Sequence, residues 1–229
     1  MKLTNIEHIF FDLDHTLWDF DKNSALAFNA VFEKNKIFVE LDKFMKVYVP
    51  INANYWKLYR ENKVSQTDLR YGRLKESFDG LEMAISDEQI LLLSSDYIDF
   101  LPTNNHLLEG AIELLEYLEP VYKLHIITNG FHEVQYKKLK NSKIFHFFDT
   151  ITTSEDVGVK KPNKLIFEKA METAGAAIYN SVMIGDNLEA DIMGAQEIGM
   201  RAILYNYHKE ECSPEYLQVL EMKEILGYL

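Results

Sequence analysis

The chain has 229 residues, of which 47% are hydrophobic and 13% aromatic, so it can bury a sizeable core and is not a disordered segment. Its formal net charge of −12 leaves no broad basic surface, which excludes a nucleic acid polymer or an anionic membrane as a general partner. Cys212 is the single cysteine, so no internal disulfide can form. No apolar run approaches the roughly 20 residues that cross a bilayer, and we expect a soluble, cytoplasmic protein.

The first expected element is a buried strand, the apolar run HIFF at residues 8–11, which leads directly into Asp12. From residue 19 to about residue 100 the sequence pattern is helical. For example, apolar residues recur at helical spacing in the stretch ALAFNAVF (25–32). No convincing strand pattern occurs in this region. The pattern predicts a second, helical domain of residues 17–102, inserted just after the first strand of the core.

Beyond Pro102, short apolar strands alternate with helical stretches, a pattern typical of a parallel sheet with helices on both faces. The expected strands are 123–128, 150–153, 181–186 and 201–206, and the expected helices are 109–120, 131–142, 163–175, 188–200 and a terminal one at 213–229. We therefore predict an α/β fold, a Rossmann-like doubly wound parallel sheet formed by residues 1–16 and 103–229. In such sheets ligands bind beyond the carboxyl ends of the strands.

Polar side chains mark the ends of several expected strands, at the edge where this fold binds ligands. Asp12 follows the first strand, Thr128 and Asn129 follow the apolar part of the second, and Asp186 ends a later one. Asp14 lies two residues after Asp12, so in an extended segment both carboxylates point to the same side. Two carboxylates so close resist joint ionisation unless a cation lies between them or one of them holds a proton. The alternative for such a pair is two exposed loop aspartates.

Two further segments each allow a functional and a structural interpretation. The Thr128 hydroxyl and the backbone amides of Asn129 and Gly130, at a turn into a helix, form a natural anion site, although such turns are common. Lys160 and Lys161 stand just before a proline that suits the first turn of a helix. A lysine at this place either holds a phosphate at the sheet edge or belongs to a solvated surface pair.

The segment MIGDNLEAD (183–191) supplies two more carboxylates. Asp186 ends a buried strand, and Asp191 lies on the first turns of the next helix. Acidic residues at a helix N-terminus are stabilised by the helix dipole, so capping is one interpretation of either. The other is a hard-cation site completed by a carboxylate from another strand, because Mg²⁺ takes oxygen ligands and retains several waters.

The order of these segments resembles the haloacid dehalogenase superfamily. The chain has D-x-D after the first strand, a Thr after the second, a Lys-Pro pair, and Gly-Asp with a further Asp five residues on. All four motifs of the superfamily are present in the expected order, and the resemblance covers roughly residues 5–16 and 105–206. It implies phosphoryl chemistry, because the dehalogenating members lack the second Asp of the first motif, which is Asp14 here.

The resemblance also implies a role for each matching residue. Asp12 is the nucleophile, which attacks phosphorus to form an aspartyl-phosphate and also contacts the metal. Asp14 is the general acid and base, and its backbone carbonyl joins the metal. Thr128 and the Asn129 amide hold the phosphoryl oxygens. Lys161, rather than its neighbour, balances the charge between the nucleophile and the phosphoryl group.

The implied cofactor is Mg²⁺. Asp186 is its implied direct ligand, and Asp191 supports the same site directly or through water. The helical insertion of residues 17–102 resembles the superfamily's helical cap of the first type, which closes over small soluble substrates.

The stretches DLDHTLWDFDKNS and TNGFHEVQYKKLKNS look like the branch of this superfamily that acts as pyrimidine 5′-nucleotidases on standard and noncanonical nucleotides. The resemblance implies nucleoside monophosphates such as UMP, dUMP and dTMP as substrates. Trp18 and Phe20, just past Asp14, either stack on the base or pack at a hinge. The alternatives within the superfamily are a phosphoglycolate or sugar-phosphate phosphatase and a phosphomutase, and outside it a phosphorylatable receiver-type signalling domain. A monomer and a homodimer both remain open.

Overall fold

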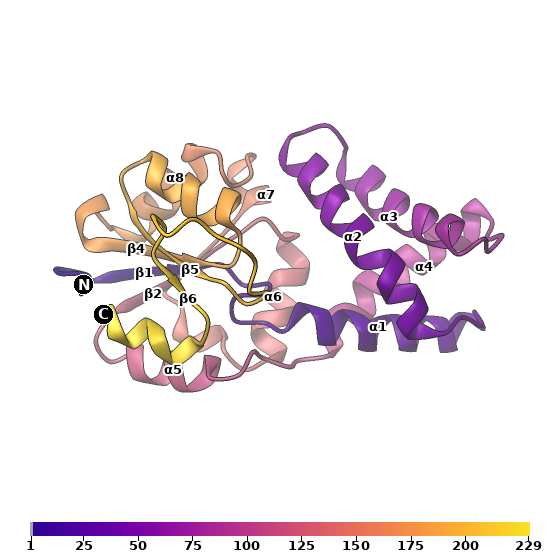
Figure 1. The fold of residues 1–229 in the computed structure, drawn as a ribbon, viewed down its shortest axis with the longest axis horizontal. Helices are drawn as coiled ribbons and strands as arrows, with labels where there is room; N and C mark the ends of the chain where they lie inside the picture. The colour runs from indigo at the N-terminus through magenta and orange to yellow at the C-terminus, as the bar shows by residue number, and fades with distance from the viewer. Residues whose placement is uncertain (1) are drawn as a thin grey trace. The chain divides into compact units, whose positions relative to one another are not determined.

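Residues 2–229 are described in a computed structural model of the chain, which divides into two compact units (Figure 1). The sheet unit consists of the residues up to Phe20 together with Asn105–Leu229, and the helical unit consists of Asp21–Asn104. Residues 17–20, which the sequence pattern placed in the insertion, are therefore part of the sheet unit.

Within the described residues, the sheet unit contains a six-stranded sheet in the order β3-β2-β1-β4-β5-β6, and every neighbouring pair is parallel. The strands are β1 (His8–Phe11), β2 (Lys123–Thr128), β3 (Thr150–Thr153), β4 (Ser181–Gly185), β5 (Arg201–Tyr205) and β6 (Gln218–Val219). The central strands are almost wholly buried because helices cover both faces of a sheet of this kind. The predicted α/β doubly wound fold is confirmed, and the second and third strands begin and end at the predicted residues.

The strand order reverses at β1, which lies at the centre of the sheet. The chain moves from β1 to β2 and β3 on one side and then crosses to β4 and β5 on the other. Phe11 pairs with Ile126 in β2 and with Ile184 in β4. This register places the carboxyl ends of the three strands close together at one edge of the sheet. A crevice for ligands forms at such a reversal, directly after the residue where β1 ends.

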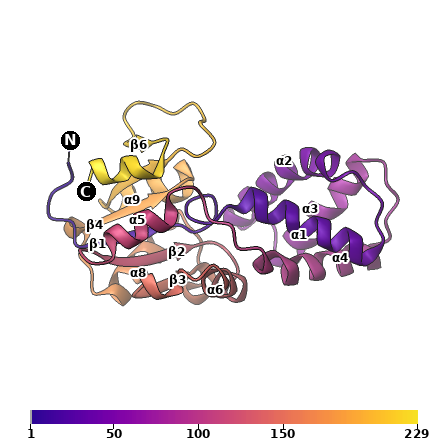
Figure 2. The same ribbon diagram turned by 90° about the horizontal axis from the view of Figure 1, so that it is seen from below.

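Helices cover both faces of the sheet, with α5 (Ala111–Leu118) and α8 (Lys164–Ala174) on opposite faces (Figures 1 and 2). The other helices of this unit are α6 (His132–Asn141), α7 (Ser154–Val157) and α9 (Gly194–Glu197), with 3₁₀ turns at Phe145–Phe147 and Ile178–Asn180. The face under α8 holds a closed apolar core in which Phe10 and Met183 of the sheet meet Phe167. Gly175 ends α8 in a left-handed conformation (φ 63°), as its place in the sequence predicted.

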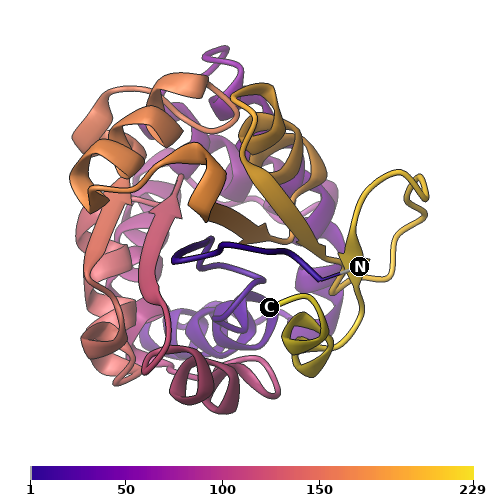
Figure 3. The same ribbon diagram turned by 90° about the vertical axis from the view of Figure 1, so that its left-hand side faces the viewer.

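Two predicted helices are wrong in part. The helix expected at 188–200 is a π-helix, Leu188–Met193, followed by the short α9. The terminal helix expected at 213–229 is a short strand, β6, and a 3₁₀ helix at Met222–Gly227. Pairing with the open edge of β5 competes with helix formation there and takes the first part of the segment into the sheet. The last residues then lie beside the start of the described chain, where Leu3 N–H donates to the Tyr228 carbonyl at 2.8 Å (Figure 3).

The helical unit is built around aromatic side chains. Its helices are α1 (Phe20–Asn35), α2 (Leu41–Arg60), α3 (Gln66–Gly80) and α4 (Asp87–Phe100), followed by a 3₁₀ turn at Leu101–Thr103. The Phe28 ring lies 4.8 Å from Phe44, 4.6 Å from Tyr48 and 4.2 Å from Tyr97, measured between ring centroids. Capping boxes at Ser65 and Ser86 begin α3 and α4. None of the helices in residues 2–229 has the length and apolar character that a membrane span requires.

Candidate active site

Three neighbouring strands end at one edge of the sheet and carry the predicted polar residues there. Asp12 directly follows β1, Thr128 is the last residue of β2, and Asp186 directly follows β4. Asp12 N–H donates to the Ile184 carbonyl at 2.9 Å, which continues the ladder between β1 and β4 past the last residue of β1. The parallel register therefore brings together side chains from distant parts of the sequence.

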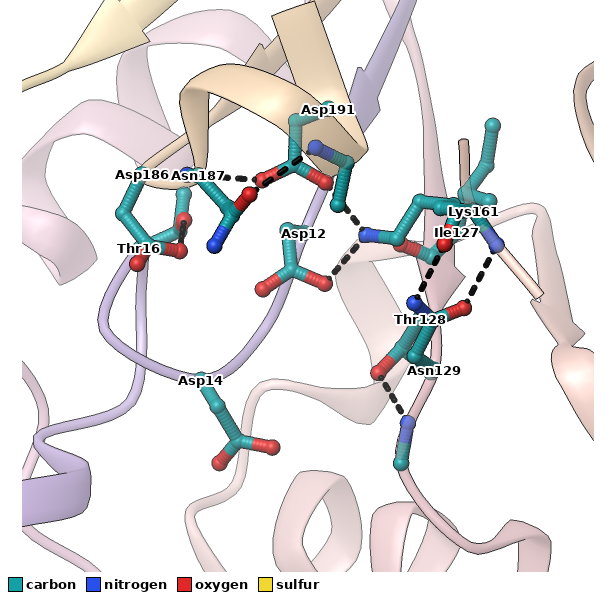
Figure 4. Close-up of polar contacts among 12 residues, drawn as sticks. Asp12, Asp14, Thr16, Ile127, Thr128, Asn129, Lys161, Asp186, Asn187 and Asp191 are labelled. Carbon is teal, nitrogen blue, oxygen red and sulfur yellow. Dashed lines mark hydrogen bonds and ion pairs between the residues drawn. The ribbon is translucent and has the colours of Figure 1, made fainter. Parts of the chain in front are cut away.

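Lys161 lies among these side chains, although it comes from the loop between α7 and α8 (Figure 4). Its ammonium is 2.6 Å from Asp12 Oδ1 and 2.6 Å from Asp191 Oδ1, and it donates to the Ile127 carbonyl at 2.7 Å. The Asn129 side chain holds the Lys161 backbone, because its amide donates to the Lys161 carbonyl at 3.0 Å and its oxygen accepts from Lys161 N–H at 2.8 Å. The loop after β2 therefore determines where this lysine lies.

Asp191 reaches the same edge from the π-helix. It is buried, and its Oδ2 accepts from the Asn187 N–H at 3.0 Å. Asn187 also begins this helix, because its Oδ1 accepts from Ala190 N–H at 2.8 Å. A Cβ atom at Gly185 would lie 2.3 Å from Asp191 Oδ2, which is too close for two non-bonded atoms. The bare backbone at the end of β4 thus allows the carboxylate to approach the sheet.

The side chains of Asp12, Asp186 and Asp191, hereafter the carboxylate cluster, have carboxylate oxygens within 4.8 Å of one another. Burial raises the pKa of Asp12 well above its usual range, and the charges of Asp191 and Asp186 add to this effect against that of Lys161. Burial and the Asp191 charge also raise the pKa of Asp186 to about 8. Negative charge exceeds positive charge here, and closely spaced carboxylate oxygens are a donor set that fits a hard divalent cation.

The Thr128 hydroxyl is oriented by its neighbours. Its Oγ1 accepts from Gly130 N–H at 3.1 Å and from the Gln135 side-chain amide at 2.8 Å. A hydroxyl has two acceptor positions and one hydrogen. Since both acceptor positions are used in these contacts, the O–H is oriented to donate to a further acceptor, as the predicted contact with a phosphoryl oxygen requires.

Asp14 is set apart from the group around Lys161 (Figure 4). The turn after it includes His15 in a left-handed conformation (φ 61°), and the chain returns so that Trp18 pairs with Asp14 in an isolated bridge. The Asp14 carboxylate then contacts α6, where Lys138 Nζ lies 2.5 Å from Oδ1 and Gln135 Nε2 donates to Oδ2 at 3.0 Å. The two aspartates of the first motif therefore have different partners.

Trp18 and Phe20 lie beside Lys138. The Trp18 side chain is buried, and its indole N–H donates to Ser142 Oγ at 3.2 Å. Its ring centroid is 4.3 Å from Lys138 Nζ, and that of Phe20 is 5.4 Å away. Phe20 keeps part of its surface exposed. Of the two aromatic residues considered for contact with a base, Trp18 is fully buried and Phe20 is only partly buried.

The family model of the haloacid dehalogenase-like hydrolases matches residues 9–205 of the chain. The chain belongs to this family. In a crystal structure, the HAD-hydrolase YfnB from Bacillus subtilis bound to magnesium matches the chain with a TM-score of 0.88 at 29% identity, over 98% of each chain. The resemblance drawn from the order of the motifs is confirmed, as is the fold it implied.

Among the curated relatives of this hydrolase are two named nucleotidases and one named phosphatase. The pyrimidine 5′-nucleotidase PynA of Streptococcus pneumoniae is 32% identical over 225 residues, covering 96% of the chain and 91% of the relative. The pyrimidine 5′-nucleotidase YjjG of Escherichia coli is 32% identical over 204 residues, covering 89% and 87%. The glyceraldehyde 3-phosphate phosphatase of Methanothermobacter thermautotrophicus is 30% identical over 240 residues, covering 96% and 100%. The prediction that the chain is an enzyme, a hydrolase of the haloacid dehalogenase type, is confirmed.

The motifs of the family did not reveal the side chains that surround Asp14. Gln135 and Lys138 lie outside the motifs, and so does Thr16, whose hydroxyl donates to Asp186 Oδ1 at 3.2 Å. The signal that could have found Lys138 is helical spacing, because it shares the buried face of α6 with Val134 and Leu139 among other buried residues. A lysine on such a face requires a partner inside the protein.

Proposed function

We propose that this hydrolase is a Mg²⁺-dependent phosphatase, which cleaves small phosphate monoesters through a phosphoryl group carried on Asp12. We further propose that its substrates are pyrimidine nucleoside monophosphates such as UMP, dUMP and dTMP. The observation that carries the reaction type is the meeting of the carboxylate cluster with Lys161 at the carboxyl ends of β1, β2 and β4.

The excess of negative charge in the carboxylate cluster supports the metal dependence. Asp12 and Asp186 would hold Mg²⁺ together with the Asp14 backbone carbonyl, and Asp191 would hold it directly or through water. The magnesium bound to YfnB supports the same choice of ion. When bound, the ion offsets the repulsion between an anionic nucleophile and an anionic phosphoryl group.

In the proposed first step, the Asp12 carboxylate attacks phosphorus, and the bond from phosphorus to the leaving oxygen breaks. Lys161, 2.6 Å from Asp12 Oδ1, balances the charge that passes from the nucleophile to the phosphoryl group. The Thr128 hydroxyl and the Asn129 backbone N–H donate to the phosphoryl oxygens. Asp14 gives its proton to the departing alkoxide, which leaves as the alcohol.

In the proposed second step, a water molecule gives a proton to the Asp14 carboxylate and attacks phosphorus. The bond between phosphorus and the Asp12 oxygen breaks, so the Asp12 carboxylate is restored and inorganic phosphate leaves. Asp14 recovers in this step the proton that it gave up in the first. The different surroundings of the two aspartates suit these different roles.

Two observations support nucleotides as the substrates. The relatives PynA and YjjG are pyrimidine 5′-nucleotidases. Next to Asp14, the His15 ring lies 5.0 Å from Phe20, 6.3 Å from Tyr207 and 5.1 Å from His208, measured between centroids. Part of this group is exposed to solvent. Flat rings beside the leaving-group acid offer faces on which a nucleobase can stack.

A triose phosphate is the second candidate, because the glyceraldehyde 3-phosphate phosphatase matches the chain over 96% of its length. Both classes present a phosphate monoester to the same groups and differ only in what lies beyond the leaving oxygen. Glyceraldehyde, glycolate and sugars carry no aromatic ring, so the group around His15 favours the nucleotide.

We also propose that the helical unit serves as a cap that covers the bound substrate. It is inserted in the sequence between the segments that carry Asp14 and Thr128. Interdomain movement has been described for YfnB, which supports a cap that opens and closes. Such a cap excludes water during phosphoryl transfer and admits it afterwards.

Phosphate release from a panel of monophosphates tests the proposed function. The panel contains UMP, dUMP, dTMP, glyceraldehyde 3-phosphate, phosphoglycolate and glucose 6-phosphate, each with Mg²⁺ and with EDTA. We expect the highest kcat/KM with the pyrimidine nucleotides, loss of activity in EDTA and recovery with Mg²⁺. Activity on the triose phosphate but not on the nucleotides would overturn the substrate class, and hydrolysis unaffected by EDTA would overturn the metal dependence.

A further inference from the structure

Helix α6 carries two buried polar side chains that the steps above do not use. Gln135 is 0% exposed and Lys138 is 2% exposed. Val134 and Leu139 are buried on the same helix, so this face of α6 turns toward the interior. A buried ammonium or amide is costly unless it is bonded. Both groups bond to Asp14.

Asp14, Gln135 and Lys138, hereafter the Asp14 clamp, hold the carboxylate at both of its oxygens. Lys138 Nζ is 2.5 Å from Oδ1, and the Gln135 amide donates to Oδ2 at 3.0 Å. The same amide nitrogen donates to Thr128 Oγ1 at 2.8 Å. An amide nitrogen carries two hydrogens, and these two contacts use both. The Asp14 carboxyl is therefore fixed relative to the hydroxyl that is proposed to hold a phosphoryl oxygen.

Two aromatic rings hold Lys138 in turn. Its ammonium lies 4.3 Å from the Trp18 ring centroid and 5.4 Å from that of Phe20. Trp18 is itself held by the hydrogen bond from its indole N–H to Ser142 Oγ. Cation–π contacts and charge-assisted hydrogen bonds are stronger where water is excluded. The ammonium thus has a carboxylate and ring faces around it, with little access for water.

We propose that Lys138, together with Gln135, is the positioning residue of Asp14, and that Trp18 acts on the reaction through Lys138 rather than by stacking on a nucleobase. This inference rests on the proposed phosphatase function. A carboxyl group turns about its side-chain bonds unless both oxygens are held, and a general acid must lie within hydrogen-bond reach of the leaving oxygen. Lys138 also faces the charge that Asp14 carries once it has given up its proton.

The test compares two leaving groups in the variant Lys138→Met, which removes the ammonium and keeps a long apolar side chain. The alkoxide leaving from UMP needs a proton, whereas the phenolate leaving from p-nitrophenyl phosphate does not. The ratio kcat/KM reports the steps up to the first phosphoryl transfer. We expect it to fall about 100-fold for UMP and less than about 5-fold for the aryl phosphate.

Two further variants separate positioning from structure. Lys138→Arg should recover most of the activity on UMP, because a guanidinium also donates to a carboxylate and stacks on aromatic rings. Lys137→Met is the matched control, since Lys137 is the preceding residue of α6, is 48% exposed and pairs with Glu133. This variant should change kcat/KM for each of the two substrates by less than about twofold.

Equal losses on both substrates in Lys138→Met, with an unchanged melting temperature, would overturn the positioning role and leave the phosphatase function standing. No phosphate release by the natural chain from any substrate of the panel would overturn the proposed function itself. If circular dichroism shows that Lys138→Met is unfolded, kcat/KM for UMP and for p-nitrophenyl phosphate is measured in Lys138→Gln instead. A larger loss for UMP supports the positioning role, and equal losses overturn it.

Discussion

Two lysine–aspartate pairs follow β1, and they differ in how their charges balance. Lys161 faces the carboxylate cluster, in which its positive charge meets several negative ones. Lys138 pairs with Asp14, and the Gln135 amide bonds to the second oxygen of that carboxylate. The first arrangement has an excess of negative charge, whereas the second pairs one ammonium with one carboxylate.

This difference separates two tasks that use the same pair of residue types. Burial, together with the neighbouring carboxylates, raises the pKa of Asp12 and Asp186, and the excess of negative charge creates a place for a cation. A balanced pair leaves no such place and instead fixes the direction of a carboxyl group. We therefore expect substitutions in the carboxylate cluster to change the metal requirement, and substitutions in the Asp14 clamp to change the dependence on the leaving group.

The largest expected effect is that of Asp12→Asn, which keeps the shape of the side chain and removes the proposed nucleophile. Activity should fall on the order of 10⁴-fold or more with alkyl and aryl phosphates alike, because neither leaving group replaces the attacking oxygen. The measurements are phosphate release and the amount of phosphorylated protein trapped by acid. Trapped phosphoprotein in this variant would contradict the assignment of Asp12.

The next effect is that of Asp186→Asn on metal binding. The Mg²⁺ concentration for half-maximal activity should rise by more than the roughly 10–100-fold typical of residues that only support a metal ligand. Mg²⁺ should also raise the melting temperature of the natural chain and fail to do so in the variant, because a ligand stabilises only the state that binds it. An unchanged Mg²⁺ requirement would remove Asp186 from the proposed metal site.

Two glycines allow a matched test of the difference between the carboxylate cluster and the Asp14 clamp. A Cβ atom would lie 2.3 Å from Asp191 Oδ2 at Gly185, and 2.3 Å from the Gln135 side chain at Gly130. Gly185→Ala should raise the Mg²⁺ requirement about tenfold without changing the preference between leaving groups. Gly130→Ala should lower kcat/KM for UMP about tenfold relative to the aryl phosphate, with an unchanged Mg²⁺ requirement. If Gly185→Ala changed the leaving-group preference and Gly130→Ala changed the Mg²⁺ requirement, the proposed separation between metal binding and positioning of Asp14 would be wrong.

The smallest expected effect concerns a buried group outside both pairs. Burial, with the neighbouring His8, lowers the pKa of His125 to about 4, and His125 is 1% exposed. The unfolded chain binds the proton below the ordinary pKa of 6.5 while the folded chain does not, so stability is lost as the pH falls from about 6.5 to 4. Between pH 8 and pH 5 the contribution of His125 to this loss should be about 2 kcal/mol.

Urea denaturation in EDTA, repeated with Mg²⁺, measures this acid effect. The difference in stability between the natural chain and His125→Gln isolates this effect, because in EDTA the raised pKa of Asp186 makes the folded chain more stable as the pH falls. This difference should change with pH in the same way with and without the ion, since His125 bonds to His8 and Thr150 and not to the carboxylate cluster. A difference that is constant from pH 8 to pH 5 would contradict the assignment to His125.

The sequence predicted the parts of the molecule that depend on local pattern. The positions of β1, β2 and β4 were predicted from apolar runs that end in a polar residue. The family was predicted from the order of the motifs. The structure brings Asp12, Lys161 and Asp186 to one edge because parallel strands place their carboxyl ends together. Their catalytic roles stay predictions.

The parts that escaped prediction depend on contacts between distant segments. Lys138 stands among other lysines of α6, a pattern typical of a solvated helix face, and its contact with Asp14 joins segments that are far apart in the sequence. The segment 213–229 has a helical appearance, but the open edge of β5 draws part of it into the sheet as β6. The π-helix at Leu188–Met193, in which Asp191 is buried, was likewise not evident from the helical spacing.

The Gln135 amide nitrogen that bonds to both Asp14 and Thr128 has a consequence for inhibition. Because the amide is planar and stiff, the distance between the Asp14 carboxyl, the proposed proton donor, and the Thr128 hydroxyl, the proposed phosphoryl ligand, is nearly constant. A compound that carries a phosphate mimic and a hydrogen-bond acceptor at that same separation would meet both groups without any rearrangement. Vanadate joined to a short alcohol should therefore bind more tightly than vanadate alone, and this advantage should disappear in a chain where the amide is replaced by a carboxylate.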